Sequence, residues 1–360
     1  MPRCDFVDWF KAIGITLIVY GHVAHATTVP WTPPIYVKQF GVALFLFATG
    51  FTLAREGRSP AAVLIKRLTP VYVLGLGMAV LMTTIGFALG SGLELSNYLP
   101  FLGGANVVFN HFPANPTTWY LGSYVHALLL WALVLRRGRI TMALALAMLA
   151  IEIPVRTMLI AWAGPYIAYQ LLTNWIAVFI AGLAWGARPD EQPSGSSLPY
   201  FVALGGGLTA WALAMKTVGF APIFPFMTID RWPLLTGTLA ISAAVSVLYL
   251  SATLLTFGAM RRLPAPGPVR FLARHSLVIV LAHMPIFFAL NPVLSVMGVS
   301  YAAKVVIHMA IYLPGLAWLS AIVVRVVRPN AIADRLLLTF LDRPAMRTSS
   351  PGPMPSLEHR

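Results

Sequence analysis

The sequence is dominated by long apolar runs that follow one another with only short polar gaps. A helix of roughly 20 apolar residues crosses the hydrocarbon core of a bilayer, so each such run predicts one membrane-spanning helix. Backbone groups in lipid must bond within their own segment, and successive runs therefore predict an all-α bundle. About ten runs are present, at roughly 10–28, 35–54, 68–90, 119–135, 140–161, 165–187, 198–216, 232–257, 271–293 and 301–326.

The composition agrees with a membrane protein. The chain is 58% hydrophobic and 10% charged, with a mean hydropathy of +0.78, whereas a soluble protein has about 25% charged residues. The sequence therefore predicts an integral membrane protein. We expect a single membrane domain over residues 1–341, followed by a polar, Pro-rich and disordered cytoplasmic tail over 342–360.

Basic residues gather in alternate gaps, which predicts an orientation in the membrane. Arginine and lysine are abundant in the second, fourth and eighth gaps and after the tenth run, whereas the sixth gap has no basic excess. Positively charged loops stay in the cytoplasm, so both termini are predicted to be cytoplasmic. The same distribution accounts for the net charge of +14 and argues against nucleic-acid binding.

The first 26 residues also have an interpretation as a signal peptide, because Ala24-His25-Ala26 imitates a cleavage site. Against it, Asp5 and Asp8 lie in the leading segment, and the apolar run is long enough to span a bilayer. We expect the run to be retained as the first span.

This first run carries polar groups at membrane depth, where they are costly and usually functional. Lys11 and His22 are eleven positions apart, so on a helix they lie within roughly 20° of one face and about 16 Å apart along the axis. Asp8 stands three residues before Lys11 and can pair with it. One helix face therefore offers a cation at the membrane edge and an imidazole inside the membrane.

This arrangement resembles the start of the membrane-bound acyltransferase-3 family, in which ten residues separate a basic residue from a histidine. Asp8, Lys11 and His22 stand at the matching positions; the family more often has arginine at the place of Lys11. The resemblance implies an enzyme that moves an acyl group from cytosolic acyl-CoA to a hydroxyl of a carbohydrate outside the membrane. It implies donor binding by Lys11, catalysis by His22 and a supporting role for Asp8.

A basic pair before the third run also resembles the family. Lys66 and Arg67 match the pair, whereas Pro70 stands where the family has a further arginine. Two adjacent cations at a cytoplasmic helix entry suit the phosphates of acyl-CoA, and the guanidinium of Arg67 binds phosphate better. For Lys66, contact with lipid headgroups is an equal alternative.

Three more stretches resemble the family in the expected order. The second run ends in Thr49-Gly-Phe, where a hydroxyl residue is usual; we treat Thr49 as a supporting residue and favour helix packing as the reason for it. Trp119 and Tyr120 begin the fourth run and are candidate contacts to a sugar on the outer side, although Trp119 also suits an interface anchor. His283 ends an apolar run before Pro285, where it either lines a cavity or bonds to a carbonyl that the proline frees.

The role of His22 has two versions. As a general base it takes the proton from the sugar hydroxyl, and as a nucleophile it carries the acyl group transiently. Two other functions remain open: a proton-coupled transporter or lipid-linked sugar flippase with a histidine relay, and a non-catalytic subunit of a polysaccharide exporter.

The resemblance also implies ligands and a compartment. It predicts acetyl-CoA as donor, no metal, and a carbohydrate acceptor such as exopolysaccharide, O-antigen or glucan. The scarcity of acidic residues agrees with the absence of a carboxylate metal site. We expect a multi-pass protein of the bacterial cytoplasmic (inner) membrane, and a homodimer remains open.

Overall fold

The fold of the chain is helical throughout the residues that a computed structural model describes, which are 4–26, 37–90, 98–105, 108, 119–188, 195–218 and 234–340. The predicted all-α fold is confirmed. The helices are α1 (Asp5–Ala26), α2 (Val37–Ala54), α3 (Pro60–Ala88), α4 (Tyr98–Leu102), α5 (Trp119–Leu133), α6 (Met142–Ala163), α7 (Pro165–Gln170), α8 (Ile176–Gly186), α9 (Leu198–Val218), α10 (Leu234–Met260), α11 (Gly267–Val296), α12 (Tyr301–Ile307), α13 (Leu313–Val327) and α14 (Pro329–Phe340). Single turns at Leu135–Arg137 (η2) and Leu172–Asn174 (η3) and a π-helical turn at His308–Tyr312 (η4) complete them.

Each predicted apolar run corresponds to a helix or a helix group. Six segments of the described chain are long and apolar enough to cross a membrane. The remaining four runs form shorter apolar helices, Lys38–Ala54, Trp119–Leu133, Ile176–Gly186 and Leu198–Ala214. The prediction of a bundle of about ten spans therefore agrees with the helices.

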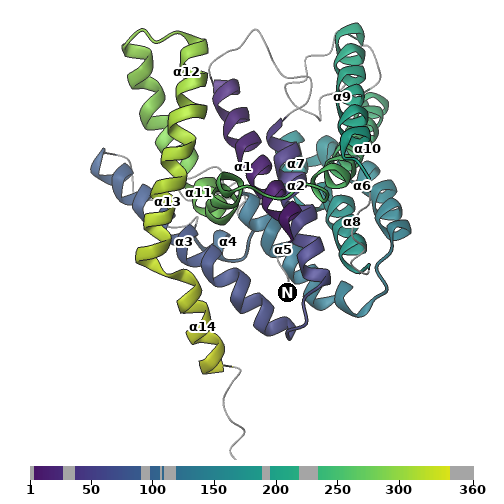
Figure 1. Ribbon diagram of the computed structural model, residues 1–360, viewed down its shortest axis with the longest axis horizontal. Coiled ribbons are helices and arrows are strands. Elements are labelled where there is room, and N and C mark those ends of the chain that lie inside the picture. The colour runs from purple at the N-terminus through teal and green to yellow at the C-terminus, as the bar shows by residue number, and fades with distance from the viewer. Residues whose placement is uncertain are drawn as a thin grey trace, which may run out of the picture.

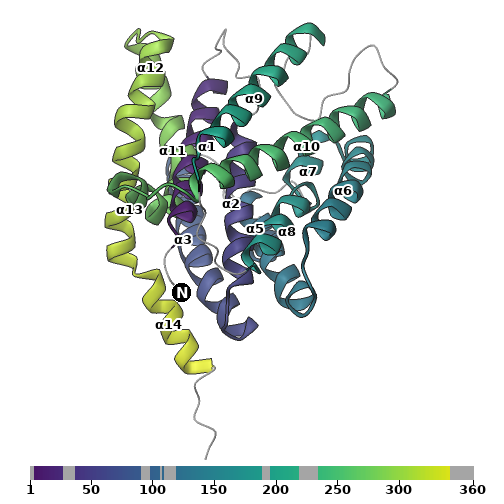
Figure 2. The same ribbon diagram turned by 45° about the vertical axis from the view of Figure 1, so that its right-hand side comes forward.

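Helices α1 and α2 occupy the middle of the bundle, with α11 and α13 on one side and α6, α8 and α10 on the other (Figures 1 and 2). Glycines allow the central helices to approach closely. A Cβ atom on Gly41 would lie 2.5 Å from the carbonyl oxygen of Gly14, and one on Gly50 would lie 2.2 Å from that of Phe179. Small residues thus bring α1 to α2 and α2 to α8, as in other membrane bundles.

Helices α1 and α11 run side by side in the same direction. At their starts Asp5 pairs with Arg270 at 3.4 Å, and the indole nitrogen of Trp9 donates to the carbonyl of Pro264 at 3.3 Å. Further along, the rings of His22 and His283 are 5.1 Å apart. Residues at corresponding depths of the two helices therefore contact each other.

The basic gaps meet at one end of the bundle. Arg136 donates to the carbonyl of Arg58 at 3.0 Å, and Arg55 donates to the carbonyl of Gly186 at 3.2 Å. The side chain of Arg58 also bonds to Glu56, with the closest atoms 2.6 Å apart, and this hydrogen bond lowers the pKa of Glu56. These contacts join gaps that the sequence predicts to face the cytoplasm, and the orientation itself stays a prediction.

Two predicted runs differ in their boundaries from the helices of the structure. Helix α3 begins at Pro60, capped by Ser59, so Lys66 and Arg67 lie inside the helix. The predicted run 165–187 is divided into α7, η3 and α8, because the backbone is extended at Leu171.

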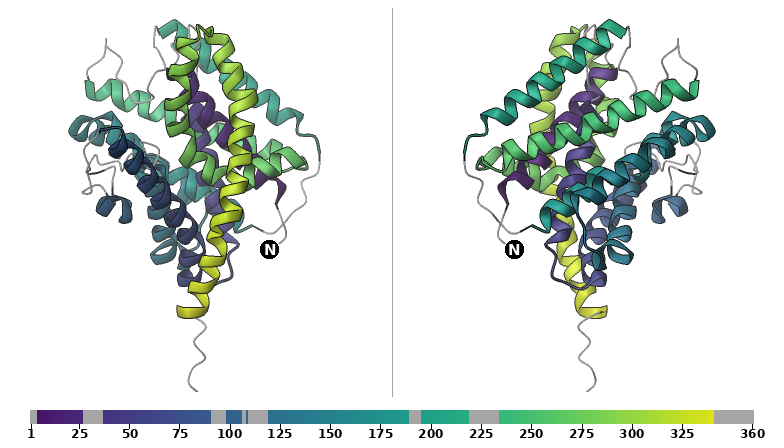
Figure 3. Two further views of the ribbon diagram at one scale, coloured as in Figure 1. Left: turned by 90° about the vertical axis from the view of Figure 1, so that its left-hand side faces the viewer. Right: turned by 90° about the vertical axis from the view of Figure 1, so that its right-hand side faces the viewer.

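Beyond the tenth run the structure adds a helix. α13 ends at the left-handed Arg328, after which Pro329 starts α14, and the two helices lie end to end (Figure 3). The predicted tail over 342–360 lies outside the described residues.

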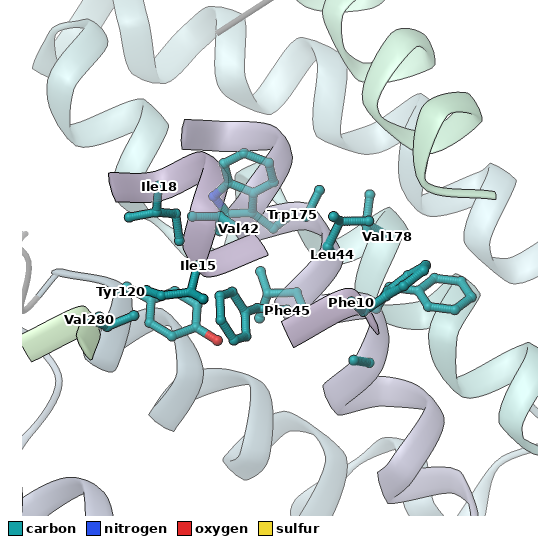
Figure 4. Close-up of a cluster of buried hydrophobic side chains, with 14 of the residues drawn as sticks. Phe10, Ile15, Ile18, Val42, Leu44, Phe45, Tyr120, Trp175, Val178 and Val280 are labelled. Carbon is teal, nitrogen blue, oxygen red and sulfur yellow. The ribbon is translucent and has the colours of Figure 1, made fainter. Parts of the chain in front are cut away.

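The hydrophobic core joins the central helices to their neighbours (Figure 4). Phe10 and Ile15 of α1 and Leu44 of α2 are fully buried, and Trp175 closes the core beside α8. Tyr120 of α5 lies between Phe45 and Val280 in Figure 4. Burial of these side chains fixes how α1, α2, α5 and α11 meet around the site described below.

Candidate active site

A cavity of about 220 Å³ lies between α1, α2, α3, α5 and α11. Four of the predicted site residues line it together, Lys11, Thr49, Arg67 and Tyr120. They come from four different helices, so only the tertiary fold brings them to one place. The pocket is bounded on the α11 side by Arg274, Ser276 and Val280.

Three cationic side chains line this cavity, from three helices: Lys11, Arg67 and Arg274. A hydrogen bond of 3.1 Å from Arg67 to the hydroxyl of Thr52 holds one guanidinium in place. Asp8 lies close enough to Lys11 to interact with it electrostatically, but the described lining of the cavity contains no carboxylate. Three like charges around a small cavity favour an anionic ligand, and phosphate suits the two guanidinium groups.

Hydroxyl groups line the cavity between the cations. Thr49 donates to the carbonyl of Phe45 within its own helix at 2.8 Å, which satisfies its proton and leaves its oxygen as an acceptor. Tyr120 is almost fully buried, and its ring packs against Phe45 at 5.8 Å. The sequence predicts Tyr120 as a contact to a sugar on the outer side, and in the structure Tyr120 lines the same cavity as Lys11.

His22 and His283 face each other beyond the cavity. His22 lies on the same face of α1 as Lys11, about 16 Å along the axis, and is partly buried. His283 is 1% exposed, and its ring centroid is 5.1 Å from that of His22. Ser276 lines the cavity seven residues before His283, which on a helix is nearly the same face and about 10 Å away. Both helices therefore lead from the cavity to the histidine pair.

Two hydrogen bonds within α11 hold His283. Its Nδ1 lies 2.8 Å from the carbonyl oxygen of Val280 and 3.1 Å from that of Ile279. Neither of these carbonyls is the one that Pro285 frees, because a proline frees the carbonyl four positions before it, here that of Leu281. The hydroxyl of Tyr312, in the π-helical turn, donates to the carbonyl of His283. The position of this histidine is thus fixed from α11 and η4.

The other predicted site residues lie outside the cavity lining. Lys66 forms an ion pair with Asp334. Asp334 belongs to the amphipathic helix α14, which the sequence did not predict. Trp119 meets the edge of Tyr120, with ring centroids 6.3 Å apart, and supports that side chain. Asp8 interacts electrostatically with Lys11.

Sequence reasoning missed Arg274 as a site residue. It quoted Arg274 within the pattern that ends at His283 but gave it no role, because its neighbours in the eighth gap read as topology signals. The departure at Pro70, where the resemblance predicts an arginine, was the available signal that another cation was needed. Arg274 supplies a cation from a distant part of the sequence.

The fold and this site together define a multi-span membrane protein with a cationic cavity and a buried histidine pair. Among the described residues no group of three or more His, Cys, Asp and Glu side chains could hold a metal ion. The model of the acyltransferase-3 family, described as an acyltransferase domain, matches residues 5–326. The chain belongs to this family and is a multi-pass membrane acyltransferase. No curated protein and no solved structure matches it.

Proposed function

We propose that the chain transfers an acetyl group from cytosolic acetyl-CoA to a hydroxyl of an extracytoplasmic carbohydrate, at the inner membrane of a bacterium. The observation that carries the proposal is the cavity in which Lys11, Arg67 and Arg274 converge, with His22 further along the same face of α1 as Lys11. One end of this path suits an anion and the other suits proton or acyl transfer.

The donor is held by its phosphates. Lys11, Arg67 and Arg274 offer a cluster of positive charge inside the bundle, and a ligand with several phosphate charges relieves their mutual repulsion. A thioester on a flexible arm then extends along the α1–α11 contact toward His22. The separation of about 16 Å between Lys11 and His22 leaves room for such an arm.

The chemistry takes place at His22. As a base, His22 accepts the hydroxyl proton while the hydroxyl oxygen attacks the thioester carbon and the carbon–sulfur bond breaks. As a nucleophile, its ring nitrogen first forms a bond to the acyl carbon and releases the thiol, after which the hydroxyl attacks the acyl group. Either route leaves the same products, free CoA and a sugar ester.

Turnover of purified protein with radiolabelled acetyl-CoA tests the proposal. His22→Ala should insert and fold but lose about 10²–10⁴-fold in turnover, the usual contribution of a positioned base. His126→Ala is a matched control, because His126 also lies in a span but packs beside Gly104 and does not line the cavity. Near-normal turnover of His22→Ala per folded molecule would contradict the mechanism, and transport without label transfer would favour a transporter.

The acceptor is tested in cells. A strain that lacks the gene should lose one class of glycan ester, among exopolysaccharide, O-antigen and glucan. Mass spectrometry of the glycans identifies both the acceptor and the acyl group. A lost succinyl ester in place of an acetyl ester would correct the donor.

A further inference from the structure

The buried ring of His283 is a feature of the bundle that packing alone does not explain. The Nε2 atom is buried and has no hydrogen-bond partner among the described residues, although the side chain is 1% exposed. A buried polar atom without a partner is costly and calls for an explanation, of which a catalytic role is one. The bilayer supplies no hydrogen-bonding solvent at this depth.

The hydrogen bonds of His283 fix which nitrogen carries the proton. Nδ1 lies 2.8 Å from the carbonyl oxygen of Val280, and a carbonyl can only accept. Nδ1 is therefore the donor, and in a neutral imidazole Nε2 is then a lone-pair acceptor. Its missing partner must be a donor group, such as a hydroxyl.

The orientation of the ring turns this acceptor away from the backbone of α11. Since Nδ1 is turned to the backbone of α11 itself, Nε2 on the other side of the ring points away from that helix. The neighbouring ring is His22 of α1, with a centroid distance of 5.1 Å and an angle of 54° between the planes. A hydroxyl that approaches an acyl group near His22 is within reach of His283.

We propose that His283 is a second catalytic histidine, whose Nε2 accepts the proton of the carbohydrate hydroxyl, and that His22 is the acyl carrier. This proposal rests on the proposed function and assigns separate roles to two residues within it. His22 was assigned alternative roles above, and a second base beside it leaves the nucleophilic role to His22. From the sequence, His283 was a candidate substrate contact that either lines a cavity or bonds to a carbonyl freed by Pro285.

The two steps balance in atoms and charge. In the first, the unprotonated ring nitrogen of His22 bonds to the acyl carbon, the carbon–sulfur bond breaks, and the thiolate leaves with the proton that the His22 ring gives up. In the second, the hydroxyl oxygen bonds to the acyl carbon while its proton moves to Nε2 of His283 and the carbon–nitrogen bond breaks. The proton then passes from His283 to the released nitrogen of His22, which restores both neutral rings.

The two steps are separable by experiment. Purified protein is mixed with [¹⁴C]acetyl-CoA alone, and protein-bound label and CoA release are measured. Membrane vesicles from the deletion strain, which carry the unmodified glycan, are then added, and transfer of label to the glycan is followed. Wild-type protein should show both steps.

His283→Gln separates the roles, because an amide keeps a donor for the Val280 carbonyl but is not a base. We expect its protein-bound label to remain within about threefold of wild type and its transfer to the vesicles to fall about 10²–10⁴-fold. His22→Ala should lose both steps. His308→Gln is the matched control and should keep both, because the Nδ1 of His308 likewise bonds to a carbonyl of its own helix, that of Lys304, while His308 does not line the cavity.

Wild-type transfer rates in His283→Gln overturn the proposal, as does equal loss of both steps in a protein that remains folded. If His283→Gln does not give folded protein, His283→Asn is measured in the same way. Failure of the proposed function looks different, because wild-type protein itself then transfers no label.

Discussion

Two groups of charged side chains lie inside this bundle, and they are built in opposite ways. Glu152 and Arg156 on α6 form a buried ion pair with 4% and 2% of their side chains exposed. Around the cavity, Lys11, Arg67 and Arg274 bring three charges of the same sign together, and the described lining adds no carboxylate. The first group is paired within the protein, whereas the second lines a cavity.

The partners of the ion pair tie helices together. Arg156 donates to the hydroxyl of Ser246 on α10 at 2.6 Å and to the carbonyl of Asn174 at 3.2 Å, and Glu152 accepts from the backbone of Ala177 on α8 at 3.2 Å. Charges that bond to the protein itself hold α6, α8 and α10 in place. Like charges that face a cavity favour an anionic ligand, so under the proposed function the first group is structural and the second is functional.

The largest expected effect comes from breaking the buried pair. Glu152→Leu leaves Arg156 as an uncompensated charge and should lower the free energy of unfolding by about 3–5 kcal/mol. Thermal unfolding in detergent and the yield of folded protein measure this. The double variant Glu152→Leu with Arg156→Met removes both charges and should recover most of the loss, because apolar replacement of a whole pair is often neutral.

If the ion pair only holds helices together, its removal should affect stability and not catalysis. Turnover per folded molecule should remain close to wild type in the double variant. A well-folded double variant without turnover would place the pair in the reaction, and wild-type stability of Glu152→Leu alone would show that the pair does not hold the helices.

The two groups differ in how readily a sequence reveals them, for physical reasons. The ion pair is local, since four positions separate Glu152 from Arg156, and such spacing places two side chains on one helix face. The cavity joins residues from five helices, and no periodicity within one helix encodes which helices pack together. Lys11 and Arg67 were found through the family resemblance, whereas Arg274 needed the fold.

Helix packing also determines which of the predicted residues lie next to each other. Composition and hydropathy predicted every apolar run, because burial in lipid demands length and apolarity in each run separately. They did not predict that α5 begins beside the cations, nor that α14 folds back to Lys66. Both outcomes depend on contacts between segments far apart in the chain.

Removing one cation at a time sharpens the functional side of the comparison. Lys11→Ala, Arg67→Ala and Arg274→Ala should each raise the KM for acetyl-CoA by about 10–100-fold, since a hydrogen bond to a charged group contributes about 1.5–3 kcal/mol. The kcat should change little, because binding is lost and chemistry is not. Lys11→Arg should keep most of the affinity.

Arg335→Ala is the matched control, because Arg335 is exposed on α14 and does not line the cavity. Its KM should equal that of wild type. If the three cavity variants keep a normal KM, these cations serve orientation in the membrane. A fall in stability with the loss of any one of them would show that they resemble the ion pair after all.

The smallest effect of a substitution is expected at Lys66, which shares features with the ion pair and with the cavity cations. It is a cation near the cavity end of α3, yet it is paired with Asp334, and the two side chains are 27% and 57% exposed. An exposed pair contributes about 0–1 kcal/mol and is screened by salt. Lys66→Ala should therefore lower the free energy of unfolding by less than about 1 kcal/mol, and the KM for acetyl-CoA should change by less than about fivefold, the factor that corresponds to 1 kcal/mol. Asp334→Ala is the decisive comparison, because it frees Lys66 without removing it: an unchanged KM leaves Lys66 as a helix contact, whereas a lower KM would mean that the released lysine reaches the donor phosphates.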